Sequence, residues 1–251
     1  MSSTERDEIR EIIGQTFVAI GTLARALHVE DARLEPTLNA ITAHAAAAHP
    51  AARDAGLILL TGGKLTPQAT TGRAPQLLDM KQQETGRGPC IEAAREQTLI
   101  CVNDLQRDPR WPEFSAEARA CGVSSMLCAP LWVNKRTLGT LSLYAPQSAA
   151  FGEHDKRIIE LFATLAALAL AEAQRTDHLR AALLNRDVIG QAKGIIMERY
   201  DVDADAAFST LKRVSQDRNM KLHEIARQVT EIRELPDTSE QQTSDFRQQL
   251  P

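Results

Sequence analysis

Eight polar and charged side chains near the C-terminus combine the chemistries that a nucleic-acid surface needs. They are Arg186, Gln191, Lys193, Arg199, Tyr200, Arg213, Ser215 and Lys221. Cationic side chains bind phosphate oxygens, amide and hydroxyl groups hydrogen-bond to base edges, and a tyrosine ring stacks on an unpaired base. We therefore expect these residues to bind single-stranded nucleotides. The alternative is that each cation is a solvated surface residue and that Tyr200 packs at a helix end.

The charge distribution permits such a surface without requiring it. The chain has 251 residues and a formal net charge of −4. Residues 180–235 contain ten Lys and Arg against nine Asp and Glu, so this part is slightly positive while the rest is negative. A weak asymmetry of this kind is compatible with a nucleic-acid site near the C-terminal end.

Three short helices are expected to position these side chains. Apolar residues recur three and four positions apart, which is the spacing of one helix face. They are Ile189, Ala192, Ile196 and Met197 in the first helix, Ala207, Phe208, Leu211 and Val214 in the second, and Leu222, Ile225, Ala226 and Val229 in the third. Asp201 or Asp203 can cap the second helix, and Asn219 suits a left-handed turn after it.

Small residues along these helices are expected to let the backbones approach closely. They are Gly190, Ala192, Gly194, Ala206 and Ala207, and for Gly194 we favour packing over contact with a ligand. Lys193 follows Arg186 by seven residues, which predicts that both side chains lie on one face of the first helix.

The preceding part of the chain predicts an α+β domain with a mostly antiparallel sheet and flanking helices, so two domains are expected in all. Alternating or buried apolar runs indicate strands at residues 55–60, 65–71, 98–102, 124–133 and 137–144. Helical spacing of apolar residues indicates helices at residues 7–27, 33–49, 75–84 and 112–121.

A helix longer than usual is expected to join the two domains, because no Pro or Gly interrupts residues 153–185. Heptad positions hold Ile158, Leu161, Leu165 and Leu168, and the register resumes at Leu179 and Ala182. This pattern predicts a coiled-coil contact between two copies of the chain. The alternative is packing within one subunit only. The polar residues 236–251 predict a disordered tail.

The four cysteines show no metal-site spacing and no CxxC pair, so free or buried thiols are expected, with a redox sensor as the alternative. Cys90 follows a Gly-Pro turn, where it is either a reactive thiol or a small buried residue at a helix start. His44 and His49 lack the spacing of a metal pair. We identify no metal site and no cofactor.

Motifs for catalysis and for membrane targeting are also missing. No phosphate-binding Gly-Lys-Ser loop or nucleophile elbow occurs, and no acidic pair of a phosphoacceptor domain follows an early strand. We therefore expect no enzymatic activity. The charged N-terminal residues and the shortness of the apolar stretch 158–171 predict a cytoplasmic protein without membrane contact.

The C-terminal segment resembles the ANTAR family of RNA-binding transcription antiterminators. The resemblance extends over residues 185–232 and rests on Gln191–Arg199, Ala206–Phe208, Leu211, Ser215, Asn219, Lys221–Leu222 and Ala226. The first domain is similar to GAF sensor domains at Gly88–Ala93, Ala129–Leu131 and Leu138–Leu141. We place the GAF-like domain at residues 4–172, its last helix continuing to about 184, and the ANTAR-like domain at residues 185–235.

The resemblance implies a homodimer that binds stem-loop RNA in nascent mRNA, prevents a terminator hairpin from forming, and so acts indirectly on the transcription machinery. The GAF-like domain would supply the input, through a small-molecule ligand of unknown identity, a redox signal or dimerisation. Two alternatives remain open. The three helices could bind DNA, or the chain could be a small-molecule sensor whose C-terminal helices contact only protein.

Overall fold

The structure is a computed structural model that describes residue 21, residues 33–232 and residue 235. The predicted helix at residues 7–27 lies outside the described residues except for residue 21, and the predicted tail at 236–251 lies wholly outside them. The chain divides into two compact units, one up to Thr176 and one from Asp177 onward. None of the described helices has the apolar length that a membrane span needs.

A five-stranded antiparallel sheet forms the centre of the first unit. The strands are β1 (Asp54–Thr61), β2 (Lys64–Thr70), β3 (Ile100–Val102), β4 (Ser125–Val133) and β5 (Arg136–Ala145). Their order is β2-β1-β5-β4-β3, so the two hairpins expected from the sequence meet at β1 and β5. The predicted mostly antiparallel α+β domain is confirmed.

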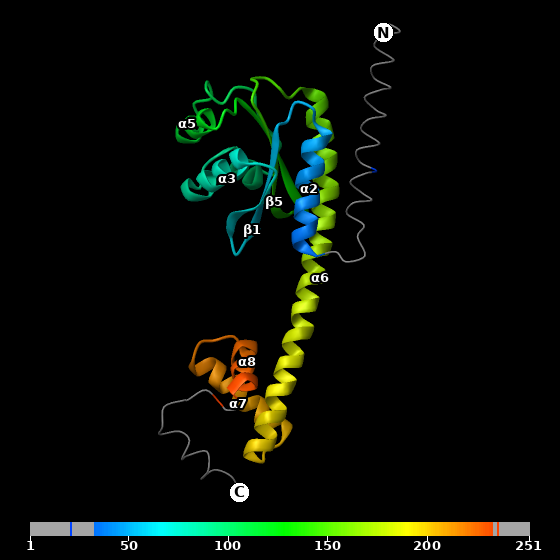
Figure 1. Cartoon of the computed structure of the whole chain (residues 1–251), viewed down its shortest axis with the longest axis vertical. Coiled ribbons are helices and arrows are strands. Elements are labelled where there is room, and N and C mark those ends of the chain that lie inside the picture. The colour runs from blue at the N-terminus through cyan, green and yellow to red at the C-terminus, as the bar shows by residue number, and fades with distance from the viewer. Residues whose placement is uncertain (1–20, 22–32, 233–234, 236–251) are drawn as a thin grey trace. The chain divides into compact units, whose positions relative to one another are not determined.

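Helices cover both faces of this sheet, because successive strand residues point to opposite sides and both sets are apolar. One face packs against α2 (Leu34–Ala48) and the first part of α6 (Glu153–Tyr200), which lie side by side in Figure 1. The other face packs against α3 (Arg73–Thr85), α4 (Pro89–Glu96) and α5 (Pro112–Ala120). The two cores therefore share the sheet and differ in their helices.

The helix α6 continues through the position where we expected one helix to end and the next to begin. It is a single helix of 48 residues, Glu153–Tyr200, and it supplies the first helix of the C-terminal bundle. The expected break near Asn185 is therefore wrong. The physical reason is that no Pro removes a backbone hydrogen bond there, and a lone Asn such as Asn185 is tolerated inside a helix.

The helices α7 (Ala204–Asp217) and α8 (Leu222–Ile232) complete the three-helix bundle on the end of α6. Its core contains Ala192, Ile196, Ala207, Leu211, Val214, Ile225, Ala226 and Val229, all buried. Between the two candidate capping residues, the structure selects Asp203, whose carboxylate accepts hydrogen bonds from the backbone N–H groups of Asp205 and Ala206. Asn219 adopts the expected left-handed conformation, with φ of 50°.

We predict that the substitution Asp203→Ala lowers the free energy of unfolding of the C-terminal bundle by about 1 kcal/mol, because two N–H groups at the start of α7 lose their acceptor. Native-state hydrogen exchange of the α7 and α8 amides measures this loss. Asp203→Asn is the control, since an asparagine oxygen caps equally well. Equal protection in the Ala and Asn variants would contradict the assigned cap.

Candidate nucleic-acid interface

An exposed aromatic ring and a lysine lie together on the flank of the bundle formed by α6 and α7. The ring of Phe208 is 41% exposed, although the sequence placed this residue on the apolar face of its helix. The ammonium group of Lys193 lies over the ring, 5.9 Å from its centre. A cation held at an exposed ring face can contact a phosphate while the rest of the ring remains free to stack on a base.

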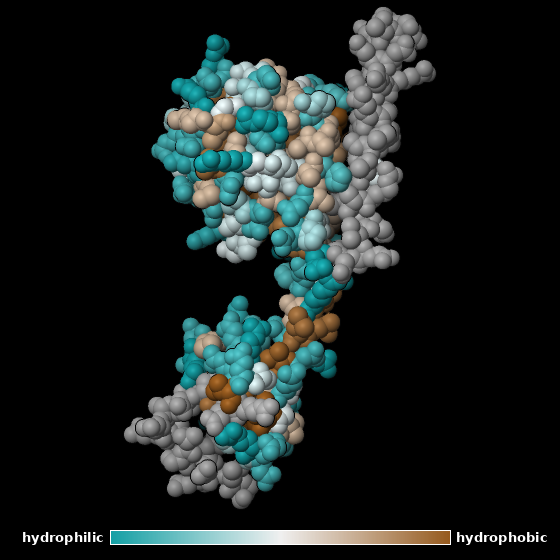
Figure 2. All heavy atoms as spheres, viewed as in Figure 1, coloured by the Kyte–Doolittle hydropathy of each residue, from teal (hydrophilic) through white to brown (hydrophobic). Residues whose placement is uncertain are grey.

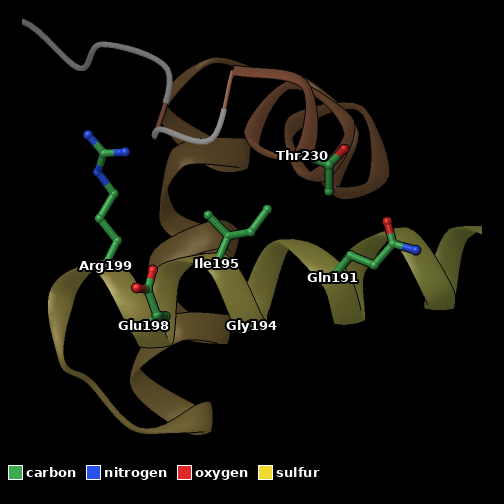
Figure 3. A pocket seen from close by; sticks show the side chains of 6 residues that line it. All are labelled: Gln191, Gly194, Ile195, Glu198, Arg199 and Thr230. Atoms are coloured by element: carbon green, nitrogen blue, oxygen red, sulfur yellow. The ribbon is translucent and has the colours of Figure 1, made fainter.

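A groove of about 690 Å³ runs along the other flank of α6, beside α8 (Figure 3). Gln191, Ile195, Glu198 and Arg199 line it from α6, and Thr230 lines it from α8. Ile195 and Thr230 point toward one another across the groove in Figure 3, with Gln191 and Arg199 toward its two ends. Two of the predicted RNA-binding residues, Gln191 and Arg199, are therefore brought to one surface.

Glycines occupy the outer face of α6 between these two flanks. A side-chain carbon at Gly190 or Gly194 would meet no other atom within 4 Å. Close packing of these glycines within the three-helix bundle, which we expected, is therefore wrong, and Gly194 instead lines the groove. Ala206 is also exposed, whereas Ala192 and Ala207 are fully buried as expected. A glycine inside a helix lowers helix stability by about 1 kcal/mol relative to alanine. At Gly190 and Gly194 no packing contact within the described residues offsets this loss.

The turn between α7 and α8 accounts for two further predicted residues. The hydroxyl of Ser215 donates a hydrogen bond to the carbonyl oxygen of Met220, at 2.6 Å. Lys221 comes directly after Met220 in the sequence and is exposed. Its backbone N–H donates a hydrogen bond to the Glu224 carboxylate at 3.2 Å. The Ser215 hydroxyl thus closes the turn that presents Lys221.

The remaining predicted residues are spread around the bundle. Tyr200 is half-buried and packs against the bundle core, whereas Arg186 and Arg213 are exposed. Arg213 follows Phe208 by five residues, which places the two about 140° apart around α7. The structure therefore separates Arg213 from the flank that carries Lys193.

Sequence reasoning missed Phe208 as a surface residue. Its spacing from Ala207 and Leu211 fits the apolar face, and the only signal of exposure was its place at the edge of that face, directly before the polar Ser209. Among the described residues, no group of His, Cys, Asp or Glu is arranged to hold a metal ion.

The two units match two known domain families. The ANTAR domain model matches residues 177–229, and the GAF domain model matches residues 31–171. A GAF sensor domain followed by an ANTAR domain is the architecture of a transcription antitermination regulator. The chain belongs to the GAF domain family and carries an ANTAR domain after the GAF domain, as the sequence predicted.

Solved structures share the fold of the first unit. The free methionine-R-sulfoxide reductase from Neisseria meningitidis, in complex with its substrate, is 17% identical, with a TM-score of 0.51 over 63% of this chain and 89% of that chain. The fRMsr of Staphylococcus aureus is also 17% identical, with a TM-score of 0.50 over 62% and 95%. Identities this low show a shared fold alone. No curated protein matches the chain.

We predict that Ser215→Ala lowers the free energy of unfolding of the bundle by about 1 kcal/mol, because the hydrogen bond to Met220 is lost. Hydrogen exchange of the α8 amides measures the effect. Ser209→Ala is the control, since Ser209 is exposed on the same helix. The structural role of Ser215 would be refuted if both variants showed the same protection.

Proposed function

We propose that the chain binds stem-loop RNA in nascent transcripts through its ANTAR domain and thereby prevents termination of transcription. The observation that carries this proposal is the pair formed by Lys193 and Phe208, an ammonium group above an exposed ring. Unpaired loop bases are recognised by stacking on rings and by polar side chains, while cations hold the phosphates. Both residues lie within residues 177–229, which match the ANTAR domain model, and this supports the proposal.

The groove beside α8 supplies a second set of contacts in this proposal. The Gln191 amide offers both a donor and an acceptor for a base edge, and the Arg199 guanidinium is suited to a phosphate or to the O6 and N7 atoms of guanine. Glu198 lies in the same groove and disfavours a phosphate close to it. Because Glu198 and Arg199 lie at the same end of the groove, we assign base recognition to Gln191 and Arg199 and phosphate contact to Lys193 outside the groove.

Duplex DNA fits the bundle less well than RNA loops. A DNA-reading three-helix domain inserts a cationic recognition helix into the major groove. The last helix, α8, carries Arg227 against Glu224 and Glu231, so its formal charge does not favour entry into the groove. The exposed ring of Phe208 also has no use against a stacked duplex, whereas an unpaired base can cover it.

A dimer formed through the outer face of α6 completes the proposal. Leu179, Leu183 and Met197 are exposed on this face together with Gly190 and Gly194. The positions 179, 183, 190, 194 and 197 are separated by four, seven, four and three residues, which is the spacing of a coiled-coil seam. Figure 2 shows hydrophobic residues gathered along the part of α6 that precedes the bundle.

Part of the seam expected from the sequence is used inside the subunit. Ile158 is buried in the sensor core and Leu165 packs against it, while Leu161 and Leu168 are exposed. We propose that the GAF domain acts as a sensor that controls dimerisation or exposure of the RNA-binding surface, without enzymatic activity, in the cytoplasm where transcripts are made. The input to this domain is a small-molecule ligand, a redox signal or dimerisation itself.

The affinity of the full chain for a stem-loop RNA can be measured beside its affinity for duplex DNA of equal charge. We expect tighter binding to the RNA, and we expect Phe208→Leu to weaken it about 5- to 150-fold, because one stacked base contributes about 1–3 kcal/mol. Phe208→Trp retains a stacking ring and serves as the control. If about four cations contact RNA phosphates, affinity should fall with salt at a log-log slope near −3.

Lys193→Ala should weaken the same RNA and make the salt slope shallower by about 0.7, the value for one lost phosphate contact. Lys64→Ala removes the same charge from the sensor domain and should leave both quantities unchanged. A preference for the DNA duplex, or equal effects of Lys193→Ala and Lys64→Ala, would contradict the proposed interface.

Two neighbouring leucines, Leu183 and Leu184, allow the dimer to be tested. Leu183→Glu should convert the dimer to a monomer, because it places a charge on the seam, whereas Leu184→Glu lies about 100° away around α6 and should remain dimeric. Light scattering coupled to size-exclusion chromatography measures the mass. A monomeric wild-type protein, or equal behaviour of the two variants, would refute the seam.

A further inference from the structure

A cluster of polar side chains is buried inside the GAF domain, away from every residue used above. It lies between α3, α4 and the sheet and consists of Asp79, Gln82, Cys90, Cys128, Ser142 and Tyr144. All six are 0% or 1% exposed. Polar groups are costly to bury unless they are paired, so a cluster of this size in an otherwise apolar core calls for a chemical explanation.

The two thiols of this cluster are in contact. The sulfur atoms of Cys90 and Cys128 are 3.7 Å apart, and both residues are free thiols. The hydroxyl oxygen of Ser142 lies 3.0 Å from the Cys90 sulfur, and Cys128 and Ser142 face each other as register partners on β4 and β5. One sulfur is therefore held against the other by a neighbouring strand residue.

Gln82 holds Cys90 in place from the opposite side. Its amide nitrogen donates to the Cys90 sulfur at 3.0 Å, and its oxygen accepts from the Cys90 backbone N–H at 2.8 Å. The side chain can reach this position because Gly88 has no side chain: a carbon there would lie 2.3 Å from the Gln82 oxygen. Gln82 and Gly88 are thus positioning residues for the thiol.

The two thiols differ in acidity. Burial raises the pKa of Cys90, but hydrogen bonds, chiefly those with Cys128, Ser142 and Gln82, outweigh burial and lower this pKa to about 7. Burial raises the pKa of Cys128 well above its usual value, and the hydrogen bond with Cys90 raises it further. Near pH 7 about half of the Cys90 groups are therefore nucleophilic thiolates, each beside a neutral Cys128 thiol that donates to it.

We propose that Cys90 and Cys128 form a redox site at which a small hydroperoxide produces a disulfide bond. The thiolate of Cys90 attacks the terminal oxygen of the hydroperoxide, the O–O bond breaks, and Cys90 becomes a sulfenic acid while the alcohol leaves. The thiol of Cys128 then attacks this sulfur, and water leaves as the S–S bond forms. Two thiols and one hydroperoxide thus give one disulfide, one alcohol and one water.

Asp79 is placed to supply the proton that the leaving oxygen needs. Burial raises the pKa of Asp79 well above its usual value, and the charge of Cys90 raises it further, so the carboxyl group can hold a proton. The Cys90 sulfur is 3.9 Å from one of its oxygens, and the Tyr144 hydroxyl donates to the same oxygen. The proton that Cys90 releases can therefore be stored on Asp79 and passed to the leaving oxygen.

The remaining movement is small. A disulfide bond is about 2.05 Å long, so the sulfurs must approach by a little over 1.5 Å from their separation of 3.7 Å. Cys128 lies on β4, which is paired with strands on both sides, whereas Cys90 is at the start of a helix of eight residues. We infer that α4 moves toward the sheet when the bond forms.

The test uses the full chain with Cys101→Ser and Cys121→Ser, which retains Cys90 and Cys128 as its two thiols. We expect hydrogen peroxide to consume both thiols of the folded protein, with a loss of two hydrogen atoms in the intact mass and a peptide that links Cys90 to Cys128. Dithiothreitol should restore both thiols. A bulky maleimide should label neither, because both sulfurs are buried.

Adding Cys90→Ser to this variant is the control and should abolish the mass loss. The proposal is overturned if peroxide leaves both thiols intact, if the mass rises by oxygen atoms without a linked peptide, or if the maleimide labels the folded protein at once. Cys101 and Cys121 are half-buried at the edges of the two cores and lie outside the polar cluster, so this variant keeps all six residues of the proposed site. Its outcome is also independent of RNA binding.

A pH profile separates this arrangement from two cysteines that are merely adjacent. The rate of thiol loss should rise with pH around a midpoint of about 7, because the reacting species is the Cys90 thiolate. Ser142→Ala removes one hydrogen bond to that thiolate and should move the midpoint to higher pH. Thr140→Val, a buried change on the same strand, should leave the midpoint unchanged. Equal midpoints in the two variants would overturn the role of Ser142.

Discussion

The structure depends on one helix that buries two different apolar stripes. In its first part α6 contributes Ile159, Phe162, Ala166 and Leu170 to the sensor core. In its last part it contributes Ala192 and Ile196 to the C-terminal core. A bundle of about fifty residues is near the lower limit for independent folding, so a first helix that is already formed lowers the cost of ordering the other two. The position of every proposed RNA contact follows from this helix.

The fold was predictable because its elements have clear periodicity. The four longer strands of the sheet follow alternating or buried apolar runs, and the Asp203 cap and the Asn219 turn are local signals that act over a few residues. The end of the linker helix near Asn185 was predicted wrongly, since the apolar pattern changes there while the backbone continues as one helix to Tyr200. Domain identity was thus easier to predict than a helix boundary.

The sites were less predictable because they depend on contacts between distant residues. Phe208 fits the spacing of a core residue, and only the crossing of α6 and α7 leaves it exposed beneath Lys193. The two cysteines of the sensor core are separated by 38 residues and meet because β4 and α4 pack together. The spacing of residues along the sequence does not predict such pairs. Cys90 and Cys128, for example, do not form a CxxC motif.

The central claim is that the flank carrying Lys193 and Phe208 receives an unpaired base. Ultraviolet cross-linking of a stem-loop RNA to the full chain, mapped by mass spectrometry to single residues, tests this claim most directly. We expect a cross-link between a loop base and the α7 peptide that contains Phe208. Cross-links confined to the sensor domain, or to paired bases of the stem, would contradict it.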